Sequence, residues 1–167
     1  MVTKKGIALT VAIIGGFVGA SFLVYLIPDF PQSDFITFSD AGEQLNFAMD
    51  RNQLVIDEFQ TVYRLWENGD IDKKRFNSST NVSLEQVNLL ILELQRKQIP
   101  SEWNQSYFLF IQALENYKVF IEQTKEYVDS KSADQPEPAD EHTYLETISE
   151  TLKKAQNLTQ ESIGAMP

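Results

Sequence analysis

The stretch that decides the fold is SEWNQSYFLFIQALENYKVFIEQTKEYV, residues 101–128. Its seam positions alternate spacings of four and three without interruption: Trp103, Tyr107, Phe110, Leu114, Tyr117, Ile121, Thr124 and Val128. This period places one stripe of side chains along a single face of an α-helix, as in helices that pack side by side. We therefore expect a helix of about 28 residues, roughly 42 Å long, that begins with Ser101 as its cap. Its aromatic residues are typical of a packed core, and a ligand pocket is the alternative.

Three further helical patterns flank this one. The first is expected from about residue 41 to Glu67, between an Asp40–Glu43 capping box and a left-handed stop at Asn68-Gly69. The second should run from about residue 71 to Ile99, where Pro100 ends it. The poor helix formers of residues 77–83 leave open one helix with a weak middle or two pieces, the latter restarting at a Ser83–Gln86 cap. A shorter fourth helix is expected at residues 143–163.

Short connections at residues 68–70 and 99–101 force neighbouring helices to run antiparallel. The predicted fold class is therefore all-α, an up-down bundle over residues 41–167 with three long helices and a shorter fourth. Residues 129–141 are acidic and proline-rich, which predicts a loop between the third and fourth helices. Asn52 interrupts the apolar seam of the first helix, where an asparagine typically fixes helix register; contact with a polar ligand or partner is the alternative.

Residues 7–27 form an uncharged run that, as a helix of about 31 Å, would match the hydrocarbon core of a bilayer. Lys4 and Lys5 precede this run and acidic residues follow it. We therefore expect residues 1–6 in the cytoplasm, a single-pass anchor in the cell membrane, a linker at 28–40 and an extracytoplasmic bundle. Cleavage at Val18-Gly19-Ala20, or removal of a pilin-like leader after Gly6, are the alternatives to a permanent signal anchor.

Small residues recur at helical spacing along the expected span, and they are Ala8, Ala12, Gly15, Gly16, Gly19 and Ala20. Such a face lets a second transmembrane helix approach closely, because packing drives helix association in lipid. We therefore expect a protein partner through the span or the bundle, in addition to the lipid bilayer itself.

Composition excludes several classes of function. The chain has a net charge of −10, and two of its 14 basic residues precede the span, so the part beyond it carries −12 and would repel nucleic acid. There is no cysteine, and the single histidine, His142, stands beside the predicted loop. Without a di-iron, thiolate or Ser-His pattern we expect no catalytic residue, cofactor or metal ion, and hence a non-enzymatic protein.

Four N-glycosylation sequons lie on the side expected to be outside the cell, beginning at Asn77, Asn81, Asn104 and Asn157. Lys4-Lys5-Gly6 before a single span, Pro-Ser-Glu-Trp at residues 100–103 and the Tyr-rich third helix resemble uncharacterised small membrane-anchored helical proteins of ammonia-oxidising archaea. The resemblance implies an archaeal cell-surface location, in which N-glycosylation is expected, and no assigned reaction. It is also compatible with an accessory subunit of a membrane enzyme such as the copper monooxygenase of those organisms.

The leading hypothesis is a membrane-anchored bundle that binds or scaffolds another protein. One alternative is an extracytoplasmic four-helix ligand sensor that signals through a partner. The other is a pilin-like filament subunit, which requires removal of residues 1–6.

Overall fold

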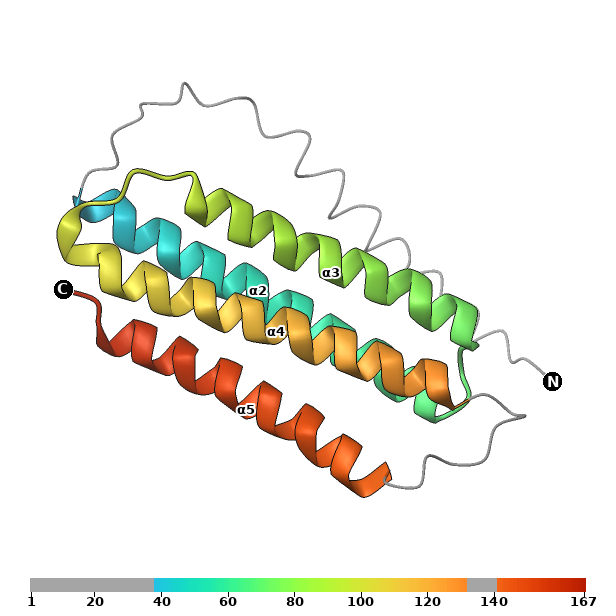
Figure 1. The fold of residues 1–167 in the computed structure, drawn as a ribbon. Helices are drawn as coiled ribbons and strands as arrows, with labels where there is room; N and C mark the ends of the chain where they lie inside the picture. The colour runs from blue at the N-terminus through green and yellow to red at the C-terminus, as the bar shows by residue number, and fades with distance from the viewer. Residues whose placement is uncertain (1–37, 132–140) are drawn as a thin grey trace, which may run out of the picture. The chain divides into compact units, whose positions relative to one another are not determined.

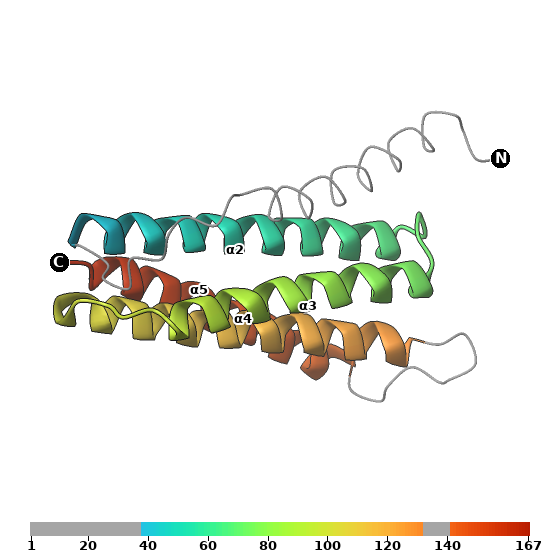
Figure 2. The same ribbon diagram turned by 90° about the horizontal axis from the view of Figure 1, so that it is seen from above.

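A computed structural model of the chain describes residues 38–131 and 141–167. These residues form α2 (Phe38–Glu67), α3 (Lys73–Gln95), the short 3₁₀ helix η1 (Ser101–Trp103), α4 (Asn104–Ser130) and α5 (Glu141–Gly164), as Figure 1 shows. Successive α-helices run antiparallel, and Figure 2 shows α2 and α3 side by side with α4 beyond α3. The predicted all-α fold with four bundled helices is confirmed for this part of the chain.

The expected membrane span, residues 7–27, lies outside the described residues. Among α2, α3, α4 and α5, none combines the length and the continuous apolar run that crossing a bilayer requires.

The core is organised around α4, which packs against α2, α3 and α5. All eight seam positions predicted for this helix are buried, and Tyr107, Phe110 and Leu114 are completely inaccessible to solvent. The Tyr107 hydroxyl donates to the Ala41 carbonyl over 2.8 Å, which joins the start of α4 to the start of α2. Burial raises the pKa of Tyr107 to about 12, with a smaller contribution from the Glu93 carboxylate, so the hydroxyl keeps its proton.

The connection between α2 and α3 follows the predicted left-handed stop. Gly69 has φ +74°, a backbone conformation that side chains with a Cβ rarely adopt, and its N–H donates to the Trp66 carbonyl over 2.9 Å. Asp72 then caps α3, because its carboxylate accepts a hydrogen bond from the Arg75 backbone N–H at 2.8 Å. The capping box predicted at Asp40 is wrong, since α2 already begins at Phe38.

Helix α3 is continuous through residues 77–83, which decides between the two alternatives in favour of one helix. The hydroxyls of Thr80 and Ser83 donate to the carbonyls of Phe76 and Ser79 in their own helix, over 2.9 and 3.4 Å. They therefore stay within the helix and do not cap a new start. The helix ends at Gln95, four residues earlier than predicted, so the chain leaves the helical conformation well before the proline.

Two other predicted boundaries also differ. Ser101 lies within η1, its hydroxyl contacts the Glu102 carboxylate at 2.9 Å, and α4 begins at Asn104 without a side-chain cap. Helix α4 runs through Ser130 and α5 begins at Glu141, so both ends of the predicted 129–141 loop are helical. Residues 132–140 lie outside the described part of the chain.

Helix α5 packs against α4 through small side chains at one end of the pair. The Ser162 hydroxyl donates to the Ser106 carbonyl over 2.7 Å, and both residues are buried. Counting from this contact along two antiparallel helices places Ala155 at the level of Ala113, and both are completely buried. Further along, larger side chains replace the small ones, so small residues set the close approach at one end of the pair.

Candidate protein-binding surface

Exposed apolar side chains gather on the outer face of α2 and α3. Phe47 and Leu54 on α2 are 59% and 64% exposed, and Val82 and Leu89 on α3 are 37% and 54% exposed. Each pair is seven residues apart, so both members of a pair lie on the same side of their helix. We call these four residues the α2–α3 stripe.

Polar contacts across the helix pair fix how the two halves of the stripe align. Arg51 donates to Glu93 at 3.0 Å, and Lys97 donates to Gln44 at 2.6 Å. Counting along the antiparallel helices from these contacts places Leu54 at the level of Leu89. The same register places Val82 two turns beyond Leu54, and Phe47 two turns before it.

The stripe therefore has three apolar levels, at Phe47, at Leu54 with Leu89, and at Val82. Successive levels are seven residues apart, or about 10.5 Å, so the whole stripe extends over roughly 21 Å. This is the spacing of one seam of a coiled coil, in which apolar residues repeat every seven positions. In the described residues no other helix covers it, because α2 and α3 use their opposite faces for the core.

An open depression of about 330 Å³ lies at the Phe47 end of the stripe. It is lined by one aromatic ring, one amide and three charged groups, namely Glu43, Gln44, Phe47, Glu93 and Lys97. The Arg51 guanidinium lies 5.7 Å from the centroid of the Phe47 ring, which holds that ring against α2. The depression can accept a side chain from a neighbouring molecule.

Charges around the stripe are unevenly compensated. Arg51 and Lys97 both pair with Glu93, at 3.0 and 3.2 Å. Among the described residues, four exposed carboxylates near the stripe form no ion pair, and they are Glu43, Asp50, Glu58 and Glu85. Two cations there, Arg75 and Arg96, also form no ion pair within the described residues. Partial burial raises the pKa of Glu58 above its usual 4.5. The rim of the stripe is therefore acidic.

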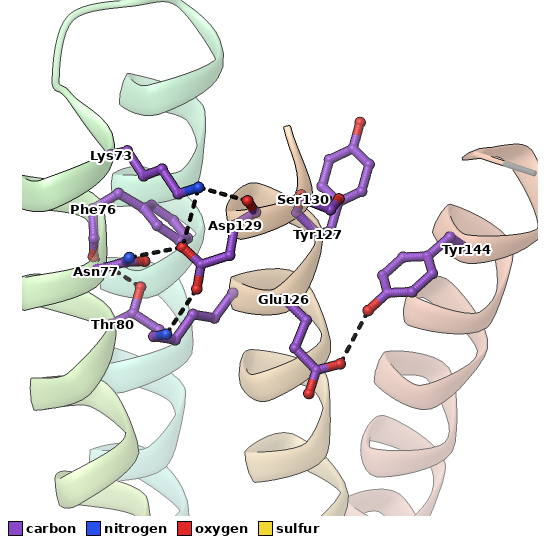
Figure 3. Close-up of polar contacts among 10 residues, drawn as sticks. Lys73, Phe76, Asn77, Thr80, Glu126, Tyr127, Asp129, Ser130 and Tyr144 are labelled. Carbon is purple, nitrogen blue, oxygen red and sulfur yellow. Dashed lines mark hydrogen bonds and ion pairs between the residues drawn. The ribbon is translucent and has the colours of Figure 1, made fainter. Parts of the chain in front are cut away.

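A second polar cluster joins α3 to the end of α4, as Figure 3 shows. The Asp129 carboxylate accepts hydrogen bonds from Asn77 at 2.8 Å and from Lys125 at 2.9 Å, and Lys73 lies 3.5 Å away. Lys73 also donates to the Asp129 carbonyl over 2.5 Å. Burial raises the pKa of Asp129, but the hydrogen bonds from Asn77 and Lys125 outweigh it, so the pKa lies below its usual value. Two cations and one amide therefore share a single carboxylate, and these contacts fasten the two helices together.

Aromatic rings fill the same end of the bundle. The Phe76 ring lies 5.9 Å from that of Trp66 and 6.2 Å from that of Phe59, measured between centroids. Tyr127 stacks on Tyr144 at 6.1 Å and so connects α4 to α5. These contacts bury the rings against one another, which assigns them to the core rather than to a ligand pocket.

The residues proposed for span packing lie outside the described part of the chain; they are Ala8, Ala12, Gly15, Gly16, Gly19 and Ala20.

The four sequon asparagines are all described, and they differ in their exposure to solvent. Asn81, Asn104 and Asn157 are exposed, whereas Asn77 is half-buried and its amide nitrogen donates to Asp129. A glycan would attach at that same nitrogen.

Asn52 is 3% exposed within the core, and its Oδ1 has no hydrogen-bond partner.

Across residues 38–131 and 141–167, no three His, Cys, Asp or Glu side chains converge in a way that could hold a metal ion. His142 lies exposed in the first turn of α5. Comparison of the chain with family models, with curated proteins and with solved structures gave no match.

Sequence reasoning missed the α2–α3 stripe. The available signal was a second heptad spacing in each helix, Phe47 to Leu54 and Val82 to Leu89, offset from the core seam. Only the contacts between the helices show that these two spacings form one surface.

Proposed function

We propose that this protein is a membrane-anchored, extracytoplasmic helical bundle without enzymatic activity that binds another protein as a scaffold or accessory subunit. The α2–α3 stripe is the observation that carries the proposal. An exposed apolar surface ordered at three regular levels is typical of a protein-binding face, whereas scattered surface hydrophobics are ordinary.

The remainder of the described surface supports this choice. The Asp129 cluster has internal polar partners, and the aromatic cluster is packed against itself. The stripe differs in that it combines exposed apolar side chains at heptad spacing on two adjacent helices with carboxylates that form no ion pair within the described residues. The membrane anchor is proposed from the uncharged run of residues 7–27, preceded by two lysines.

Purification of the full chain in mild detergent tests the proposal. Wild-type protein should retain a partner in stoichiometric amount, and the double variant Leu54→Asp/Leu89→Asp should lose it, because two carboxylates would replace the central apolar level. Leu145→Asp is the matched control, since Leu145 is also exposed, at 39%, but lies on α5.

Thermal unfolding of each variant should match that of wild type, because substitutions at exposed sites typically change stability by no more than about 0.5 kcal/mol. The proposal fails if wild-type protein is strictly monomeric without a partner. It also fails if the double variant keeps the partner as well as the control does.

A further inference from the structure

We infer that the occupant of the α2–α3 stripe is a basic amphipathic helix of a different protein. This inference rests on the proposed function and specifies the chemistry of the partner. It follows from the shape of the apolar levels and from the charge of the rim.

The apolar levels specify a helix. Three levels spaced by seven residues match a partner whose apolar side chains also repeat every seven residues. A stripe of roughly 21 Å needs about 14 residues of α-helix, or four turns. The depression beside Phe47 would take the side chain at one end of that helix.

The rim specifies the charge of this helix. Glu58 lies between the two halves of the stripe, and Glu85 lies on its α3 side, both without a cation. Lys or Arg side chains that flank the apolar positions of the partner would pair with these carboxylates. Complementary charge at the edge of an interface favours the right partner and speeds association.

The same charges argue against a parallel dimer of this chain. A two-fold axis parallel to the helices would set α2 of one copy against α3 of the other at equal levels. Counting in the register given above then places Glu58 opposite Glu85 of the other copy. Like charges directly opposed are unfavourable, and the unpaired cations on this face, Arg75 and Arg96, each lie about three turns along the chain from Glu85.

Photo-crosslinking in native membranes tests the inference with the full chain. Benzoylphenylalanine at position 54 should crosslink to a segment of another protein that carries apolar residues seven apart and a net positive charge over about 14 residues. The same probe at position 145 on α5 should give no such crosslink. Mass spectrometry of the crosslinked peptide identifies the segment.

Charge reversal supplies the second measurement. Glu58→Lys combined with Glu85→Lys should reduce the yield of the position-54 crosslink about tenfold, since two attractive contacts would become repulsive. Glu146→Lys with Glu150→Lys, on the exposed surface of α5, is the matched control and should leave the yield unchanged.

The outcomes separate this inference from the proposed function. A crosslink to a neutral or acidic segment, or an undiminished yield after charge reversal, overturns the basic partner and leaves the stripe as a docking surface. A crosslink to a second copy of the chain also overturns the basic partner. The absence of any protein crosslink at position 54 overturns both.

Discussion

Replacing one phenylalanine in the core and one in the stripe distinguishes the two roles of apolar residues in this bundle. Phe76 is completely buried, and its ring lies within 6.3 Å of the rings of Phe59, Tyr63 and Trp66. Phe76→Ala removes these contacts and leaves a cavity, so it should lower the free energy of unfolding by about 4 kcal/mol. Domains of this size have a total stability of roughly 5–15 kcal/mol, so this one substitution should remove at least about a quarter of it.

The same substitution at Phe47 should have little effect. Phe47 is 59% exposed, so its substitution removes less than half of the about 1.5–3 kcal/mol that full burial of such a side chain contributes. Phe47→Ala should therefore cost less than about 1 kcal/mol. Urea unfolding followed by far-ultraviolet circular dichroism measures both values, and equal m-values would show that the unfolded states are comparable. The reasoning is refuted if Phe76→Ala costs less than about 1.5 kcal/mol, or if the two variants cost the same.

Two further variants test the packing of α4 against its neighbours. Ala155→Leu should lower the free energy of unfolding by about 1–3 kcal/mol, because Ala155 lies buried at the level of Ala113. Lys154 beside it is exposed, so Lys154→Leu is the control and should be near neutral. An Ala155→Leu variant as stable as wild type would contradict the close packing of α4 and α5. Asp129→Asn should cost about 1 kcal/mol near neutral pH, since it removes the charge that pairs with Lys125 in a site about one-third exposed. The folded-state pKa of Asp129 lies below its unfolded value of 3.8, so its stabilisation is complete above that pH and is lost as the pH falls through the folded value. The free energy of unfolding, measured with urea across this acid range, should therefore fall less steeply with falling pH for Asp129→Asn than for wild type. Identical slopes would rule out this role.

The helices were predictable because their core seams repeat with the period of an α-helix. In α4 every predicted seam residue is buried, and in α3 the buried Thr80 and Ser83 continue the seam through a stretch of poor helix formers. Tertiary packing of this face outweighed the weak intrinsic propensity of residues 77–83.

Helix ends were less predictable, because they depend on contacts that no local pattern encodes. Ser101 has the residue type of a cap, yet the turn after Pro100 places it in a 3₁₀ helix and leaves the start of α4 without a side-chain cap. Asp72, by contrast, caps α3 although no periodic signal marks it. Local capping preferences are worth about 1 kcal/mol, which packing readily exceeds.

The candidate binding surface was the part that sequence reasoning could not assemble. Phe47 and Leu89 are distant in sequence, and each alone resembles an ordinary exposed hydrophobic residue. Their membership of one stripe depends on the Arg51–Glu93 contact, which sets the level of α2 against α3. The chain therefore indicates which residues are apolar, and the register of the helix pair indicates which of them act together.

The absence of native cysteine allows the most direct test of the proposed role. Single variants Leu54→Cys and Leu145→Cys can each be labelled on intact cells with a maleimide that does not cross membranes. An extracytoplasmic bundle whose stripe is occupied predicts rapid labelling at position 145 and protection at position 54, with the protection lost once the partner is stripped in denaturing detergent. Equal labelling of both positions on intact cells would contradict an occupied stripe, and labelling of neither until the cells are lysed would contradict the extracytoplasmic location.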